Sequence, residues 1–102
     1  ASAIDYMRKN LDRDISRAEI AEAIFLNPEY LSRLFKKETG IALNEFIIRE
    51  KMEQAKCMLS ETDIPVSLIA LKTGYTNFSY FSQVFKRHTG LSPLEYRQQH
   101  RK

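Results

Sequence analysis

The chain reads LFKKETGI at residues 34–41 and, fifty positions later, VFKRHTGL at residues 84–91. The match continues without a gap from at least residue 27 to residue 46. Its aligned pairs include Asn27 with Asn77, Tyr30 with Tyr80, Ser32 with Ser82, Glu45 with Glu95, and Phe46 with Tyr96. Self-similarity at this period is typical of one small supersecondary unit used twice. The sequence therefore predicts two copies of one unit within 102 residues.

Composition favours a helical fold for both copies. Only three glycines and three prolines are present, too few for the many turns of a β-rich domain. The single cysteine, Cys57, excludes an internal disulfide and is typical of a reducing compartment. No apolar run reaches the ~18 residues of a membrane span, and no signal peptide opens the chain. We therefore expect a cytoplasmic protein without membrane contact, and its first residue, Ala1, is typical of a piece of a longer one.

Charge is distributed unevenly along the chain. The first 30 residues hold six acidic and four basic side chains, whereas the rest holds seven acidic and twelve basic ones. A basic C-terminal part suits a polyanionic partner, although a solvated basic face is the alternative explanation of charge alone.

Capping residues and apolar spacing predict seven helices and no strand. Asn27 followed by Pro28 is an N-cap before a first-turn proline, and the helix that starts there should end at Gly40. Its second copy should run from Asn77 to Gly90. The inward-facing residues of the two helices are predicted to be Leu31, Leu34 and Phe35, and Phe81, Val84 and Phe85.

Each copy is predicted to be a helix-turn-helix, that is, a short helix, a turn and a second helix. The fold class that follows is all-α, with two helix-turn-helix (homeodomain-like) subdomains joined by a long linking helix. The predicted bounds are a first subdomain at 1–41 (helix-turn-helix about 18–39), a linking helix at 42–60, and a second subdomain at 61–102 (helix-turn-helix about 66–89).

The outer face of each second helix carries residue types that read DNA. Arginine can bind guanine, and glutamine can bind adenine, through two hydrogen bonds, while serine serves either base. The candidates for base contact are Glu29, Ser32 and Arg33 in the first copy and Ser79, Ser82 and Gln83 in the second. The candidates for phosphate contact, further along the same helices, are Lys36, Lys37, Lys86 and Arg87. A hydrophilic face exposed to solvent is the alternative for any one such helix.

The linker makes the DNA interpretation more specific. A helix of roughly 18 residues is ~27 Å long, and the width of a flanking element brings the two exposed helices to about 34 Å apart. That distance is one turn of B-DNA, so one chain could enter two successive major grooves. Because Arg33 faces bases in one copy and Gln83 in the other, the predicted site is asymmetric.

The whole chain resembles the DNA-binding domain of the AraC/XylS family of bacterial transcription regulators. The residues that carry the resemblance are Ile20-Ala21, Tyr30 to Lys36, Gly40, Ile69-Ala70, Gly74-Tyr75, Tyr80-Phe81, Phe85-Lys86, Gly90 and Ser92-Pro93. The resemblance implies two helix-turn-helix motifs, base contacts from the second helix of each, and regulation of transcription from an asymmetric promoter site on double-stranded DNA. Family members often have arginine at the position of Gln83, so an adenine or water-mediated contact is expected there.

The style of residues 27–32 and 47–51 is similar to versions found at the C-terminus of longer regulators, including response regulators. The resemblance therefore implies an upstream receiver or ligand-binding domain. We also expect RNA polymerase as a second partner, because the acidic N-terminal unit leaves room for a protein contact that is compatible with DNA binding.

Other function classes have less support in the sequence. The two histidines, His88 and His100, form no nucleophile–base or metal-ligand arrangement with Cys57, so we expect no enzyme activity, no metal and no cofactor. The serious alternative is a helical protein-interaction module, for example one that contacts RNA polymerase without sequence-specific DNA binding of its own. Tyr75 and Tyr80 are expected to pack the second unit rather than to stack on bases.

Overall fold

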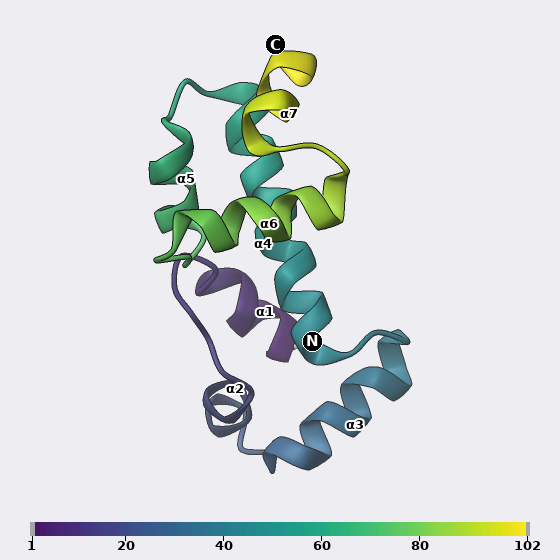
Figure 1. Cartoon of the computed structure of the whole chain (residues 1–102). Coiled ribbons are helices and arrows are strands. Elements are labelled where there is room, and N and C mark those ends of the chain that lie inside the picture. The colour runs from purple at the N-terminus through teal and green to yellow at the C-terminus, as the bar shows by residue number, and fades with distance from the viewer. Residues whose placement is uncertain (1, 102) are drawn as a thin grey trace.

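The computed structural model describes residues 2–101, and within that range the chain forms seven α-helices and no strand (Figure 1). The helices are α1 (Ser2–Lys9), α2 (Arg17–Ala23), α3 (Pro28–Thr39), α4 (Leu43–Glu61), α5 (Val66–Lys72), α6 (Phe78–Thr89) and α7 (Pro93–His100). The predicted all-α class is confirmed. None of the described helices is both long and apolar enough to cross a membrane.

The helix ends follow the capping residues in the sequence. The Asn27 side chain accepts hydrogen bonds from the amides of Glu29 and Tyr30 at 2.9 and 3.2 Å. At the other end of α3, Gly40 adopts a left-handed conformation with φ +78°, which costs glycine little. The second copy repeats this design, with Asn77 as the N-cap of α6 and Gly90, at φ +83°, as its C-cap.

The two helix-turn-helix pairs also share one turn geometry. In the first pair, the Leu26 amide donates to the Ala21 carbonyl at 2.8 Å, and in the second the Tyr75 amide donates to the Ala70 carbonyl at 2.9 Å. This is the six-residue hydrogen bond of a Schellman turn, in which one residue takes a left-handed conformation. That residue is Phe25 (φ +59°) in the first pair and Gly74 (φ +85°) in the second.

The longest helix, α4, belongs to both halves of the molecule. Its first part supplies Leu43 and Ile47 to a hydrophobic cluster with α1, α2 and α3. Its second part supplies Met52, Ala55 and Leu59 to another cluster with α5 and α6. We call α1–α3 with the start of α4 the first unit, and the rest of α4 with α5–α7 the second unit. Two separate cores are thus held on one continuous helix.

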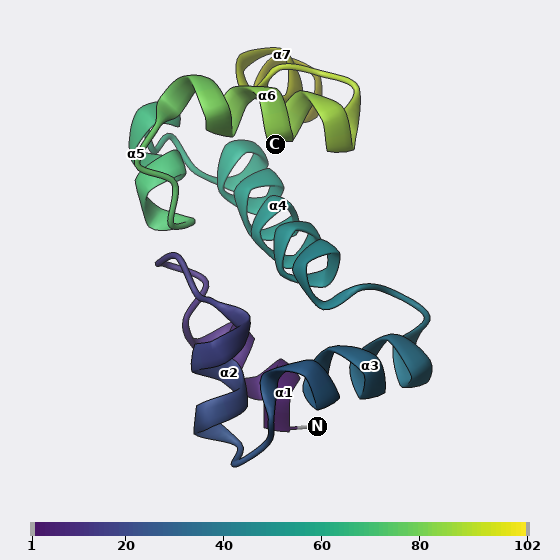
Figure 2. The ribbon, with the colours of Figure 1, turned by 60° about the horizontal axis from the view of Figure 1, so that its bottom comes forward.

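The second helices of the two pairs, α3 and α6, have the same orientation. In both views each of them runs from left to right in the direction of the chain, and in Figure 2 they lie at opposite ends of α4 (Figures 1 and 2). The molecule is elongated, with extents of 42 × 23 × 22 Å. Two similar helices are therefore separated along the long direction of the chain without being reversed.

One predicted core position differs in the structure. Leu34 was expected to face inward with Leu31 and Phe35, but it is only half-buried. It lines an apolar groove between α1 and α3 that Ile4 also lines. The reason is that the first unit has only the short α1 on this side, too small to cover the whole inner face of α3.

Candidate nucleic-acid interface

The outer face of α3 presents the first predicted set of base-contact residues together. Glu29 and Arg33 are exposed, and Ser32 between them is half-buried. Ser32 and Arg33 line an open depression of about 580 Å³ with the start of α4. The face is therefore accessible, with its serine lying deeper than its charged residues.

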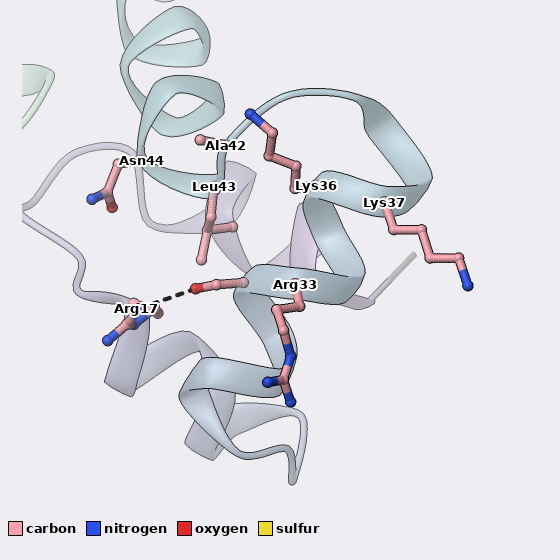
Figure 3. A pocket seen from close by; sticks show the side chains of 8 residues that line it. Arg17, Arg33, Lys36, Lys37, Ala42, Leu43 and Asn44 are labelled. Carbon is pink, nitrogen blue, oxygen red and sulfur yellow. Dashed lines mark hydrogen bonds between the residues drawn. The ribbon is translucent and has the colours of Figure 1, made fainter.

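A residue that the sequence analysis missed holds that serine. Arg17, the first residue of α2, donates from Nη1 to Ser32 Oγ at 3.3 Å (Figure 3). Arg17 is exposed and lines the same depression as Arg33 and Lys36. No pattern in the sequence marks Arg17, because its contact with Ser32 depends on how α2 lies beside α3.

The two lysines in the last turn of α3, Lys36 and Lys37, point in different directions (Figure 3). Both lysines line the depression, but Lys36 points toward the start of α4 and Lys37 points in another direction (Figure 3). The residues at the start of α4 include Ala42, an N-cap without a side-chain hydrogen bond, and Asn44. The two lysines could therefore meet phosphates on different strands or at different steps of a duplex.

The outer face of α6 presents the second predicted set. Ser79 and Gln83 are exposed and Ser82 is half-buried, the same distribution as in α3. Lys86 and Arg87 follow in the last turn and are also exposed. Within the described residues neither cation forms a salt bridge, nor do Lys36 and Lys37, so all four charges are available to a partner.

Tyr75 and Tyr80 pack the start of this face. The Tyr75 ring lies 5.4 Å from the Phe81 ring and 5.9 Å from the Tyr80 ring, centroid to centroid. Burial raises the pKa of Tyr75 to about 12, so its hydroxyl stays neutral. Tyr80 keeps 51% of its surface exposed, because it touches Tyr75 from outside the core. Packing is thus the role of Tyr75, while Tyr80 also borders the outer face.

Two of the C-terminal cations have structural partners. Arg97 donates to the carbonyls of Leu59, Thr62 and Ile64, and so holds the loop that follows α4. Arg101 forms an exposed salt bridge with Asp63. The basic character of the C-terminal part is therefore only partly available to a polyanion.

Known proteins are similar to this chain over most of its length. A model of the helix-turn-helix domain family matches residues 20–99. The arabinose operon regulatory protein of Escherichia coli K12 is 35% identical over 96 residues, which cover 93% of this chain and 33% of that protein. YesN of Bacillus subtilis, an uncharacterized transcriptional regulatory protein, is 45% identical over 78 residues, which cover 74% of this chain and 21% of that one.

Among solved structures, the C-terminal domain of AraT, a response regulator from Geobacillus stearothermophilus, superposes with a TM-score of 0.94 at 35% identity. The superposition covers 98% of this chain and 84% of that one. The chain spans between about a fifth and a third of the length of the two curated relatives. Family match, relatives and fold point the same way: the chain belongs to the AraC-type family of helix-turn-helix DNA-binding domains of transcriptional regulators.

Proposed function

We propose that the chain reads an asymmetric duplex site with α3 in one major groove and α6 in the next groove on the same face of the DNA. The observation that carries this proposal is the pair of outer faces of matching exposure on two helices of the same orientation, mounted on one continuous helix (Figure 2). Helices of this width fit the major groove of B-DNA.

The dimensions of the chain support a two-groove arrangement. The 19 residues of α4 give a support about 28 Å long at ~1.5 Å per residue. The long axis of the molecule, 42 Å, accommodates two reading helices about 34 Å apart, one turn of B-DNA. The chain would thus do alone what a symmetric dimer does with two copies.

The reading residues differ in chemistry between the two helices. Arg33 would bind guanine, and Glu29 would accept from the amino group of cytosine. Gln83 would bind adenine through two hydrogen bonds, with Ser79 beside it. In the first unit Arg17 would approach the backbone at the edge of the groove while keeping the Ser32 hydroxyl oriented.

The exposed cations would supply affinity that does not depend on sequence. Lysine and arginine side chains that neutralise phosphates release counterions, and binding then weakens as salt rises. The phosphate contacts we propose are Lys36, Lys37, Lys86 and Arg87.

A selection from random duplexes tests the proposal. We expect enrichment of one site with two unlike submotifs, centred about 10 base pairs apart, and binding that falls steeply with salt. No enriched motif, together with binding that ignores salt, would refute the proposal. Retention of RNA polymerase subunits without DNA would then favour the protein-interaction module.

We propose further that the chain acts within a longer regulator, in which a receiver or ligand-binding domain upstream controls binding and RNA polymerase is contacted at the promoter. The support is the share of the curated relatives that the chain covers. A footprint and transcription assay with the full-length protein tests both partners, because a contact with polymerase should raise open-complex formation beyond what DNA binding alone gives.

A further inference from the structure

A lysine lies on the buried stripe of α4, between the two cores. Ile47, Lys51 and Ala55 follow one another at intervals of four and so share one helix face. Ile47 belongs to the first core and Ala55 to the second. Lys51 is only 5% exposed. Because an isolated ammonium is costly to bury, its position demands partners.

The ammonium of Lys51 is fully used by backbone carbonyls from both units. It donates to Leu11 O at 2.9 Å and to Arg13 O at 2.7 Å, both in the loop between α1 and α2. Its third bond, also 2.7 Å, goes to Thr73 O at the C-terminal end of α5. A protonated lysine has three N–H donors, and each of them has one carbonyl acceptor here. One side chain thus joins the first unit, the linking helix and the second unit.

The electrostatic surroundings suit a cation at this point. Two of the acceptors lie at or just beyond the carboxyl ends of α1 and α5, where the helix dipole is negative. Burial lowers the pKa of Lys51, the charges of Asp14 and Asp12 act in the opposite direction, and the Arg13 guanidinium opposes them weakly. The Tyr75 ring, with its centroid 5.8 Å from the ammonium, faces it as well.

Gly74 lies at the point where the two units approach each other closely. A Cβ atom at Gly74 would lie 2.5 Å from Lys51 Nζ and 2.7 Å from both the carbonyl carbon and the oxygen of Arg13. The Arg13 backbone therefore packs directly on the turn between α5 and α6. Phe25 takes the equivalent position in the first unit, with the same left-handed backbone, and its side chain is 94% exposed. The close approach is thus specific to the contact between units, not a requirement of the turn itself.

We propose that Lys51 is a positioning residue that fixes the separation and orientation of α3 relative to α6, and thereby the half-site spacing that the chain accepts. The inference rests on the proposed two-groove reading of DNA. Without the three bonds, α4 still connects the units, but the loop of the first unit and the turn of the second are no longer held together. Linking two DNA-binding units raises their joint affinity only when the geometry lets both units bind the same DNA at once.

Binding measurements on Lys51→Met test the proposal. Methionine keeps an unbranched side chain, one atom shorter than that of lysine, and suits the apolar stripe, so the cores are expected to remain. Lys56→Met is the matched control, because it removes the same charge from the same helix, where Lys56 pairs with the exposed Glu53 at 2.6 Å. The probes are duplexes with both submotifs, with either submotif alone, and with one or two base pairs inserted between the submotifs.

We expect Lys51→Met to bind the full site about tenfold more weakly or worse and to bind each single submotif as the wild type does. The variant should also lose most of the wild-type preference for the submotif spacing of the selected site over the spacings with inserted base pairs. Lys56→Met should keep that preference. If Lys51→Met retains the spacing preference, or weakens single-submotif binding as much as full-site binding, the proposal is wrong.

A distance measurement on the free chain separates this inference from the proposed function. Spin labels at Glu22→Cys on α2 and Lys72→Cys on α5, both exposed positions, report on the two units in a Cys57→Ser background. We expect a narrow distance distribution in the wild type and with Lys56→Met, and a broad one with Lys51→Met or Gly74→Ala. Equal widths would overturn the inference even if the DNA site is found, while failure to select any DNA site would leave a broadened distribution as evidence for the positioning role.

Discussion

Phe25 has an unfavourable backbone conformation and a side chain that is almost fully exposed. Its φ of +59° lies in the left-handed region, where residues other than glycine and asparagine lose about 1–2 kcal/mol. Its ring is 94% exposed, so little packing is lost when it is replaced. We expect Phe25→Asn to raise the free energy of unfolding by about 0.5–1 kcal/mol, measured by urea denaturation.

A matched control is Leu68→Asn, which changes a partly exposed apolar residue within α5, where the backbone is helical. This change should lower stability, because asparagine is the poorer helix former. Destabilisation by Phe25→Asn as well would mean that the exposed ring is held by the chain in a way that its exposure does not indicate.

Glu19 makes the stability of the first unit sensitive to acid. The Arg13 guanidinium and the Tyr6 hydroxyl both donate to its carboxylate, and they lower the pKa of Glu19 to about 2. The unfolded value is about 4.3, so the stabilisation is fully present above that pH and is lost as the pH falls toward 2. We expect the urea midpoint to drop steeply over this window in the wild type and less steeply in Glu19→Gln.

Glu22, an exposed glutamate on the same helix, supplies the control. Glu22→Gln should keep the wild-type slope below pH 4.3. Equal slopes for all three proteins would show that carboxylates elsewhere govern the acid response.

At the level of elements, the proposed interface assigns α3 and α6 two kinds of DNA contact that mutation can separate. Arg33→Ala should cost about 1–3 kcal/mol on the selected site and relax the base preference at one position. Lys86→Ala should weaken binding to all duplexes alike and reduce the salt slope by about one unit. Binding isotherms on the selected site and on point variants of it, each at several salt concentrations, measure both effects. The assignment of roles fails if Lys86→Ala relaxes base preference while Arg33→Ala does not.

The elements themselves were largely predictable, because their signals are local. Asn27, Gly40 and Gly90 mark helix ends by their own side chain or backbone freedom, and the structure confirms each end. The expected burial of Leu34 failed because it depends on how much of α3 the short α1 covers, which no local pattern encodes. The core of the second unit was predicted more accurately, since Phe81, Val84 and Phe85 are all buried.

Contacts between distant segments could not be predicted from the sequence, for a related reason. Lys51 reads as an ordinary charge on an amphipathic helix, because its acceptors are backbone carbonyls 22 to 40 residues away and carry no residue signature. Arg17 likewise became visible only once α2 was placed beside α3. The residue types of the two outer faces were predictable, whereas the residues that orient them were not.

For the whole molecule, the two units combine a shared architecture with different residues on the outer faces of α3 and α6. In each unit the second helix begins after an asparagine N-cap and ends at a left-handed glycine, and a Schellman turn precedes it. The helices α3 and α6 also run in the same direction (Figures 1 and 2). The middle residues of the two proposed reading faces, Ser32 and Ser82, are identical. The asymmetry of the proposed site therefore depends on the flanking reading residues and not on the scaffold.

If the flanking residues set the asymmetry of the proposed site, giving α3 and α6 the same outer residues should make the two submotifs of the selected site alike in sequence. The double variant Ser79→Glu with Gln83→Arg gives α6 the reading residues of α3, at positions exposed in both helices. We expect a random-duplex selection with it to return a direct repeat of the first submotif, at the wild-type separation, because α4 and the contacts of Lys51 are unchanged. A control with the same residue changes on α4, Gln54→Arg with Ser60→Glu, should still select the asymmetric site. An unaltered second submotif from the α6 variant would show that bases in that groove are read by other residues, whereas an inverted repeat would contradict the shared direction of α3 and α6 on DNA.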